Sequence, residues 1–245
     1  MHDARFLSVC LLLGISGAAQ DLSFDAARND LRAVGDELAR VLQDGQASRE
    51  GISGYRVMRR YVLQNARWNQ HAEMTVAMVF EYPNQKHFDL ISSSGPEWML
   101  GVFKSLLEAE RKATFDGKLA LSIIGPQNYD IRIVGLDASA PAETYVADIS
   151  PKAHGGLMLN GRAWILRKEA AVIRFEGRPS ERVSLWVGRP FIIQTFSKVG
   201  TLWLPASTRS VAESHLFGRT ELTVESFDYA FHRDAPVQAA IPHER

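Results

Sequence analysis

The stretch "YRVMRRYVLQ", Tyr55–Gln64, has a period of two residues. Its apolar phase is Tyr55, Val57, Tyr61 and Leu63, and its polar phase includes Arg56, Arg60 and Gln64. Successive side chains of a strand point to opposite faces, so this pattern predicts a strand with one buried face. A second such face follows at Met74, Val76, Met78 and Phe80, and a short strand is expected at Phe88–Ile91.

Two segments have helical rather than two-residue spacing. Between residues 21 and 44, leucines and valines recur at helical spacing with polar residues between them, and Gly45 follows as a C-terminal cap. A second apolar stripe runs from Trp98 to Leu107, with Pro96 in the first turn. We therefore expect one helix before the first strand and one after the third.

Beyond Phe115 the chain reads as short strands separated by Gly, Pro and Asn turns. The expected strands are Leu119–Ile124, Tyr129–Leu136, Glu143–Ile149, Arg162–Leu166, Ala171–Glu176, Arg182–Val187, Phe191–Lys198, Thr201–Leu204 and Glu221–Phe231. Two helices cannot cover so large an antiparallel sheet as a second sheet would, so the sheet is expected to curl. The predicted fold is mainly β (α+β), an open, strongly curved antiparallel half-barrel of about eleven strands with helices on its concave side.

The segment "KVGTLWLPASTRS", Lys198–Ser210, places a proline inside a strand pattern. Gly200 is expected to form a hairpin turn, after which a strand begins. Proline lacks an N–H for the sheet and is tolerated at edges, strand starts and bulges, so Pro205 predicts a break or bulge. Ser207 and Ser210 lie in no motif that would make a serine nucleophilic.

Bulk properties favour an exported binding domain. Lys plus Arg and Asp plus Glu both number 28, so a net charge of zero gives no support for nucleic-acid binding. The apolar run Phe6–Ile15, followed by small residues, predicts a signal peptide over 1–19 and the export of a single domain over 20–245. Cys10, the one cysteine, falls inside that peptide, so the mature domain would hold no disulfide or thiolate site.

Catalytic motifs are missing from the sequence. There is no G-x-S-x-G elbow, P-loop, G-x-G-x-x-G or H-E-x-x-H, and the histidines are scattered singly. The acidic residues on expected strands, among them Asp148 and Glu176, fall mainly in the solvent-facing phase. We therefore expect no catalytic residue, no metal ligand and no cofactor.

The positive signal is apolar. A curved sheet filled by two helices can leave a hydrophobic hollow, in which each buried methylene contributes about 0.8 kcal/mol and an acyl chain about 10 kcal/mol. Binding of that kind needs no catalytic group. The residues expected to line the hollow are Tyr61, Met78, Phe80, Trp98, Phe103, Ile131, Tyr145, Ile173 and Phe175.

Seven segments resemble the LolA-like family of periplasmic lipoprotein carriers, and sequences described as outer-membrane lipoprotein-sorting proteins in particular. They are "YRVMRRYVL", "NYDIRIVG", "TYVADISPK", "LNGRAWI", "AAVIRFEGRPSERVSLWV", "KVGTLWLPASTRS" and "ELTVESFDYAF". The resemblance implies an open barrel with a helical lid over a cavity for lipid or lipoprotein acyl chains. It also implies an arginine that latches the lid, for which Arg56, Arg59 and Arg60 are candidates.

Two other classes of function stay open at this point. A regulatory protein of the cell envelope could use the same fold to sense lipoproteins and contact a membrane-anchored envelope protein; this predicts a polar binding surface and little extractable lipid. An enzyme on the same scaffold predicts two or more titratable groups that converge in the hollow.

Overall fold

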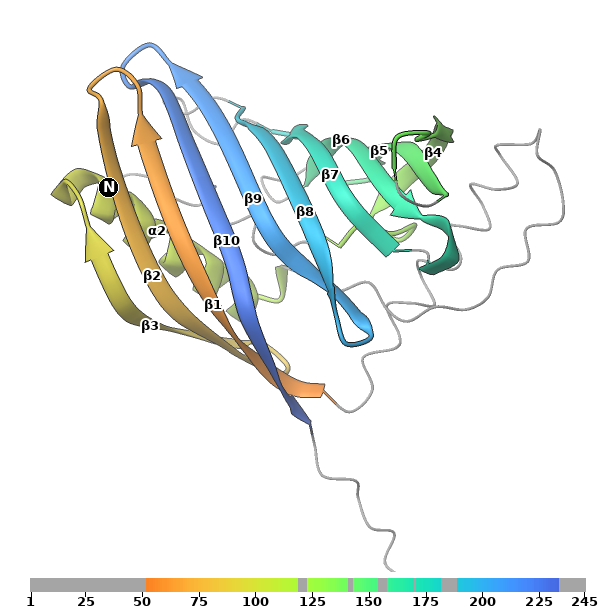
Figure 1. Ribbon diagram of the computed structural model, residues 1–245, viewed down its shortest axis with the longest axis horizontal. Coiled ribbons are helices and arrows are strands. Elements are labelled where there is room, and N and C mark those ends of the chain that lie inside the picture. Colours follow the sequence, from red (N-terminus) through yellow and green to blue (C-terminus); the bar gives the residue numbers. More distant parts are fainter. Residues whose placement is uncertain are drawn as a thin grey trace, which may run out of the picture.

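The computed structural model describes residues 52–118, 123–140, 143–153, 158–169, 171–181 and 189–233. The expected signal peptide, the helix between residues 21 and 44 and the strand Arg182–Val187 lie outside these ranges, as does most of Leu119–Ile124. The described part is one antiparallel sheet of ten strands with one long helix (Figure 1).

The helices and strands follow one another along the chain in the order given next. They are β1 (Ile52–Asn65), β2 (Gln70–Glu81), β3 (Gln85–Ser94), α2 (Glu97–Phe115), β4 (Tyr129–Leu136), β5 (Thr144–Pro151), β6 (Leu159–Leu166), the 3₁₀ turn η3 (Arg167–Glu169), β7 (Ala171–Pro179), β8 (Phe191–Val199), β9 (Leu202–Ser214) and β10 (Gly218–Arg233). The two-residue period at Tyr55–Gln64 is thus the signature of β1, and the stripe Trp98–Leu107 is that of α2.

The sheet consists of two meanders joined at one seam. Its strand order is β3-β2-β1-β10-β9-β8-β7-β6-β5-β4, and every neighbouring pair is antiparallel. β1–β3 form one meander and β4–β10 the other, and β1 pairs with β10 between them. Because β3 and β4 are the two edges, the segment containing α2 carries the chain from one edge of the sheet to the other. The sheet does not close, which confirms the predicted open, curved half-barrel with few helices.

The hairpin around Pro205 confirms two predictions and extends a third. Gly200 sits in the turn between β8 and β9 with a positive φ of 64°, a region in which glycine is favoured. The pairing of β8 with β9 shifts register where Phe196 meets Pro205, so the proline lies beside a bulge. β9 continues well past Pro205, however, and is much longer than the expected Thr201–Leu204.

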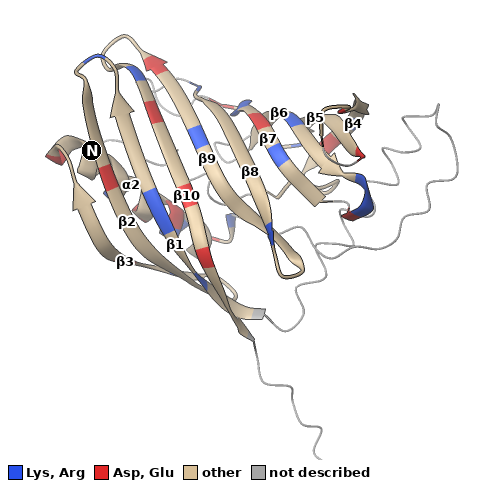
Figure 2. Cartoon of the chain, viewed as in Figure 1, with Lys and Arg blue, Asp and Glu red and all other residues tan. Residues whose placement is uncertain are grey.

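The sheet has an apolar face under α2 and a charged face opposite. On β1 the side chains of Val57, Arg59 and Tyr61 are buried on the face toward α2, which lies behind the sheet in Figure 1. The residues between them point to the opposite face, where Arg60 pairs with Glu73 of β2. Charges of both signs recur across the strands (Figure 2). We call the first face concave and the second convex.

The concave face holds two separate apolar clusters. The α2 cluster joins β1, β2, β10 and α2; its buried members are Tyr61, Leu63, Ala72, Met74, Val76, Met99, Phe103, Leu106, Leu222 and Val224. The far cluster lies on β4–β8 and adjoining segments; its buried members are Ile124, Tyr129, Ile133, Tyr145, Ala147, Ile149, Met158, Leu159, Ala163, Ile165, Val172, Phe175, Ile192 and Phe196. α2 contributes no residue to the far cluster. No helix in the described ranges is long and apolar enough to cross a membrane.

Candidate ligand-binding face

One row of paired residues crosses the concave face from β2 to β4. In sheet order it is Met74, Tyr61, Val224, Thr208, Gln194, Phe175, Ala163, Ala147 and Ile133. All nine side chains are buried. The row is apolar at both ends, and the small residues Ala163 and Ala147 stand where a large side chain would fill the concavity.

Six of the nine expected ligand-binding residues lie in or against the concave core. Tyr61, Met78 and Phe103 are fully buried at the β1–β2–α2 end, where the ring centroids of Tyr61 and Phe103 are 5.9 Å apart. Phe175 and Tyr145 are buried in the far cluster, and Ile131 packs against it. The sequence-predicted residues are thus divided between the two clusters.

The other three expected residues lie elsewhere or are less enclosed. Trp98 is 38% exposed. Its ring packs against Trp68 and Phe217 at one end of the sheet. Phe80 is half-buried beside Tyr55.

Ile173 is the third of these residues. A register shift in the pairing of β6 with β7 leaves it without a partner, and its neighbour Val172 occupies the buried position. A bulge of this kind interrupts the alternation of faces, which sequence periodicity assumes to be regular.

A buried cluster of three charges joins α2 to the sheet. The Glu110 carboxylate accepts hydrogen bonds from Nη1 of Arg59, at 2.9 and 3.0 Å to its two oxygens, and from Nζ of Lys86 at 2.7 Å. All three side chains are at most 1% exposed. Of the three arginines considered for a latch, Arg59 is therefore the one that contacts the helix. We call these residues the ion cluster.

The pKa values of the ion cluster follow from burial and charge together. Burial lowers the pKa of Lys86 to about 8, even though Glu110 favours its charged form. Burial by itself would raise the pKa of Glu110. The positive charges of Arg59 and Lys86 outweigh this effect and hold the pKa of the carboxyl below its usual value. Burial opposes the charge of Arg59 as well, and Glu110 more than compensates, so that its pKa is raised. The Glu110 carboxylate is thus held ionised between two cations.

The ion cluster supports a structural function better than acid–base catalysis. Titratable groups do converge on the concave side, as an enzyme would require. A general base, however, needs access to a substrate proton, and Glu110 has no exposed surface and both oxygens engaged. Nor do His, Cys, Asp and Glu side chains of the described ranges gather in a group of three that could hold a metal.

Within the described ranges, four buried polar side-chain atoms on the concave side have no hydrogen-bond partner. They are Nε of Arg59, the hydroxyl oxygen of Tyr61 and both amide atoms of Gln194. Buried polar groups in proteins are nearly always paired, since an unpaired one costs roughly 1–3 kcal/mol. Gln194 is the most unusual, because its whole amide group is unpaired in a fully buried position.

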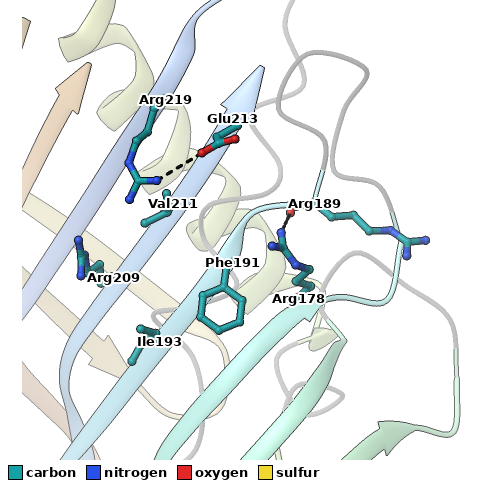
Figure 3. A pocket seen from close by; sticks show the side chains of 8 residues that line it. All are labelled: Arg178, Arg189, Phe191, Ile193, Arg209, Val211, Glu213 and Arg219. Atoms are coloured by element: carbon teal, nitrogen blue, oxygen red, sulfur yellow. Dashed lines mark hydrogen bonds and ion pairs between the residues drawn. The ribbon is translucent and has the colours of Figure 1, made fainter. Parts of the chain in front are cut away.

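The convex face carries a groove of about 440 Å³, which Figure 3 shows from close by. Its lining residues are Arg178, Arg189, Phe191, Ile193, Arg209, Val211, Glu213 and Arg219. Arg219 is bonded to Glu213 and Arg209 to Glu221, and the guanidinium of Arg189 points away from the rest (Figure 3). These ion pairs neutralise Arg209 and Arg219, whereas Arg178 donates to the carbonyl of Arg189, so the four arginines and two glutamates leave the groove with a net positive charge.

The sequence contains a signal for the two oppositely charged residues of the ion cluster, Arg59 and Glu110, which no sequence motif singles out as partners. Arg59 falls in the apolar phase of β1, between Val57 and Tyr61. Glu110 continues the stripe of Phe103 and Leu106 at helical spacing. A charged or polar residue in the buried phase of a regular pattern indicates a partner across the core, whose identity only the fold supplies.

Comparison with known proteins finds similar solved structures of low sequence identity. No family model matches the chain, and no curated protein matches it. It is similar to a DUF1329 family protein from Desulfovibrio piger, with 9% identity over 86% of this chain and 96% of that one and a TM-score of 0.41. It is also similar to a putative outer membrane lipoprotein-sorting protein domain from Vibrio parahaemolyticus, with 12% identity over 81% of this chain and 93% of that one and a TM-score of 0.42.

A LolA superfamily protein from Nitrosomonas europaea is also similar, with 8% identity over 84% of this chain and 94% of that one and a TM-score of 0.37. At such low identities and TM-scores, the ligand and the function of this chain follow only from its own residues.

Proposed function

We propose that the protein binds a lipid, or the acyl chains of a lipoprotein, on the concave side of its sheet and carries it through the periplasm without chemical change. The observation that carries this proposal is the apolar concave face, whose two clusters lie on either side of β9 while the described helix belongs to only one of them. The proposed ligand packs against the far cluster.

Simple dimensions show that α2 alone covers only part of the sheet. A helix of 19 residues is about 28 Å long and about 10 Å across, so it covers roughly two strands when it lies along them. Ten strands span about 43 Å from edge to edge. α2 packs on β2 and β3. An acyl chain on the rest of the face would leave water for an apolar surface, with a gain on the order of 10 kcal/mol.

In this proposal the ion cluster fixes α2 on the β1–β3 end of the concave face, beside the ligand rather than over it. Glu110 bonds the helix to β1 and β3 through Arg59 and Lys86. Moving α2 would separate charges in a region without water, so the helix stays in place unless a ligand or partner compensates. Catalysis is not part of this function, because the titratable groups that converge are fully engaged with one another.

Lipid binding is tested by native mass spectrometry of the purified protein and by displacement of a fluorescent fatty acid. Ala163→Leu adds bulk to the concave row, whereas Arg162→Leu adds the same side chain to the convex face one residue earlier. We expect Ala163→Leu to lower affinity for the fatty acid and Arg162→Leu to leave it unchanged. A protein that carries no lipid and binds no fatty acid would refute the proposal.

The alternative of an envelope regulator that contacts a membrane-anchored protein has one observation in its favour, the convex groove. It predicts that Arg178→Ala and Phe191→Ala, both in the groove, abolish partner capture without changing fatty-acid affinity. Extractable lipid bound to the concave face, with no effect of these groove variants on function in cells, would favour the carrier.

A further inference from the structure

We propose that Gln194 is the polar anchor of the concave face and that it selects an acyl chain attached through an amide, which offers a carbonyl acceptor and an N–H donor together. This inference rests on the proposed function and specifies the ligand of the same face. Gln194 lies on β8 between the two apolar clusters, where an acyl chain on the face would pass.

The orientation of Gln194 follows from its neighbours in the sheet. It is paired with Phe175 of β7 and Thr208 of β9, both of which are buried. Ile193, the residue before it, lines the convex groove (Figure 3), so the glutamine side chain points to the concave side.

The described residues around Gln194 provide no hydrogen-bond partner for its side-chain amide. Ile192 and Phe196, two residues away on either side along β8, are both buried apolar side chains. Thr208 already has an interaction partner of its own. The other unpaired polar atoms, on Arg59 and Tyr61, belong to β1, three strands and therefore about 14 Å away. Gln194 is thus an unpaired amide with apolar neighbours on β7 and β8 and a buried threonine on β9.

Its two unpaired atoms define what a complementary ligand must supply. The amide nitrogen of Gln194 donates and its oxygen accepts. An ether offers only a weak acceptor, and an ester offers a carbonyl but no donor. A secondary amide offers both and can pair with the glutamine as backbone amides pair with one another.

The test uses three probes of equal chain length that differ at one linkage: N-methylhexadecanamide, methyl hexadecanoate and hexadecyl methyl ether. Each displaces a fluorescent fatty acid from the wild-type protein and from Gln194→Met, which keeps the length of the side chain and removes its amide. We expect the wild type to bind the amide at least about tenfold more tightly than the ether, with the ester between them. In Gln194→Met the three affinities should converge.

Two controls separate this selectivity from a general disturbance. Thr195→Val changes the neighbouring convex position, so the preference for the amide should persist. Gln194→Met should be at least as stable to urea as the wild type, since it removes an unpaired buried group. If the wild type binds all three probes with equal affinity, Gln194 is not an anchor and the proposed lipid binding stands. If none of the probes nor the fatty acid binds, the proposed function fails and this inference fails with it.

Discussion

Replacing Glu110 by glutamine should cost the protein a large part of its stability. The carboxylate accepts three hydrogen bonds from Arg59 and Lys86, and all three groups are excluded from water. Glutamine keeps the shape of the side chain but removes its charge, which leaves two buried cations side by side. Breaking a buried pair in this way typically costs about 3–5 kcal/mol, compared with a total stability of about 5–15 kcal/mol for a domain.

The loss is limited by one compensating event. Lys86, whose pKa already lies near 8, can give up its proton once Glu110 no longer favours the charged form. We therefore expect a loss of about 3 kcal/mol for Glu110→Gln at pH 7. Urea unfolding followed by far-UV circular dichroism measures it, with the slope of the transition checked for two-state behaviour.

The matched control is Glu108→Gln, two residues earlier on the same helix. Its carboxylate forms an exposed pair with Arg111 and should contribute almost nothing. The difference between wild type and Glu110→Gln should also shrink below pH 4.5. The pKa of Glu110 is lower in the folded protein than in the unfolded chain, so the stability it contributes is present above the unfolded pKa and is lost on acidification. The explanation is wrong if Glu110→Gln costs no more than Glu108→Gln.

Three further predictions concern the same sheet. Between pH 8 and 10.5, Lys86 keeps its proton in the unfolded chain and has lost it in the folded protein. The free energy of unfolding of the wild type should therefore rise over this range by up to about 3 kcal/mol more than that of Lys86→Met. Parallel curves of unfolding free energy against pH for the two proteins would contradict this. Tyr61→Phe removes an unpaired hydroxyl and should not reduce the urea midpoint, whereas Tyr129→Phe removes an acceptor of a backbone N–H and should lose about 1 kcal/mol. Gly161→Ala would place a Cβ 1.9 Å from a carbonyl oxygen of β7 and should cost at least about 2 kcal/mol of unfolding free energy, while Gly135→Ala, with open space around it, serves as the control and should be neutral.

The sequence predicted the strands well because each has a regular two-residue pattern. β4 matches its predicted bounds, and β1, β2, β7, β8 and β10 differ mainly by residues added at their ends. The seam between β1 and β10 could not be read in this way, since periodicity says which face of a strand is buried and not which strand lies beside it. The sequence pattern predicts that strand pairing can end at Pro205, and it therefore underestimates the length of β9. In the structure, the bulge beside Pro205 lets the hydrogen-bonded pairing with β8 resume.

The candidate site was predicted in its apolar part only. Alternation placed Tyr61 and Phe175 correctly on the buried face. The same method failed at Ile173, because one extra residue in the pairing of β6 with β7 reverses the phase. Gln194 was overlooked since an isolated polar residue in a strand is usually on the solvent side; only the register shows that it falls in the buried phase of β8.

The seam between β1 and β10 has a consequence for how the chain acquires its structure. The partners Tyr61 and Val224 are separated by more than 160 positions along the chain, so their pairing is of very high contact order. Such pairings form slowly, because the entropy of closing the long loop is lost before the contact stabilises it. Until β10 has been synthesised, β1 and β9 each present an unpaired edge, and open edges invite aggregation.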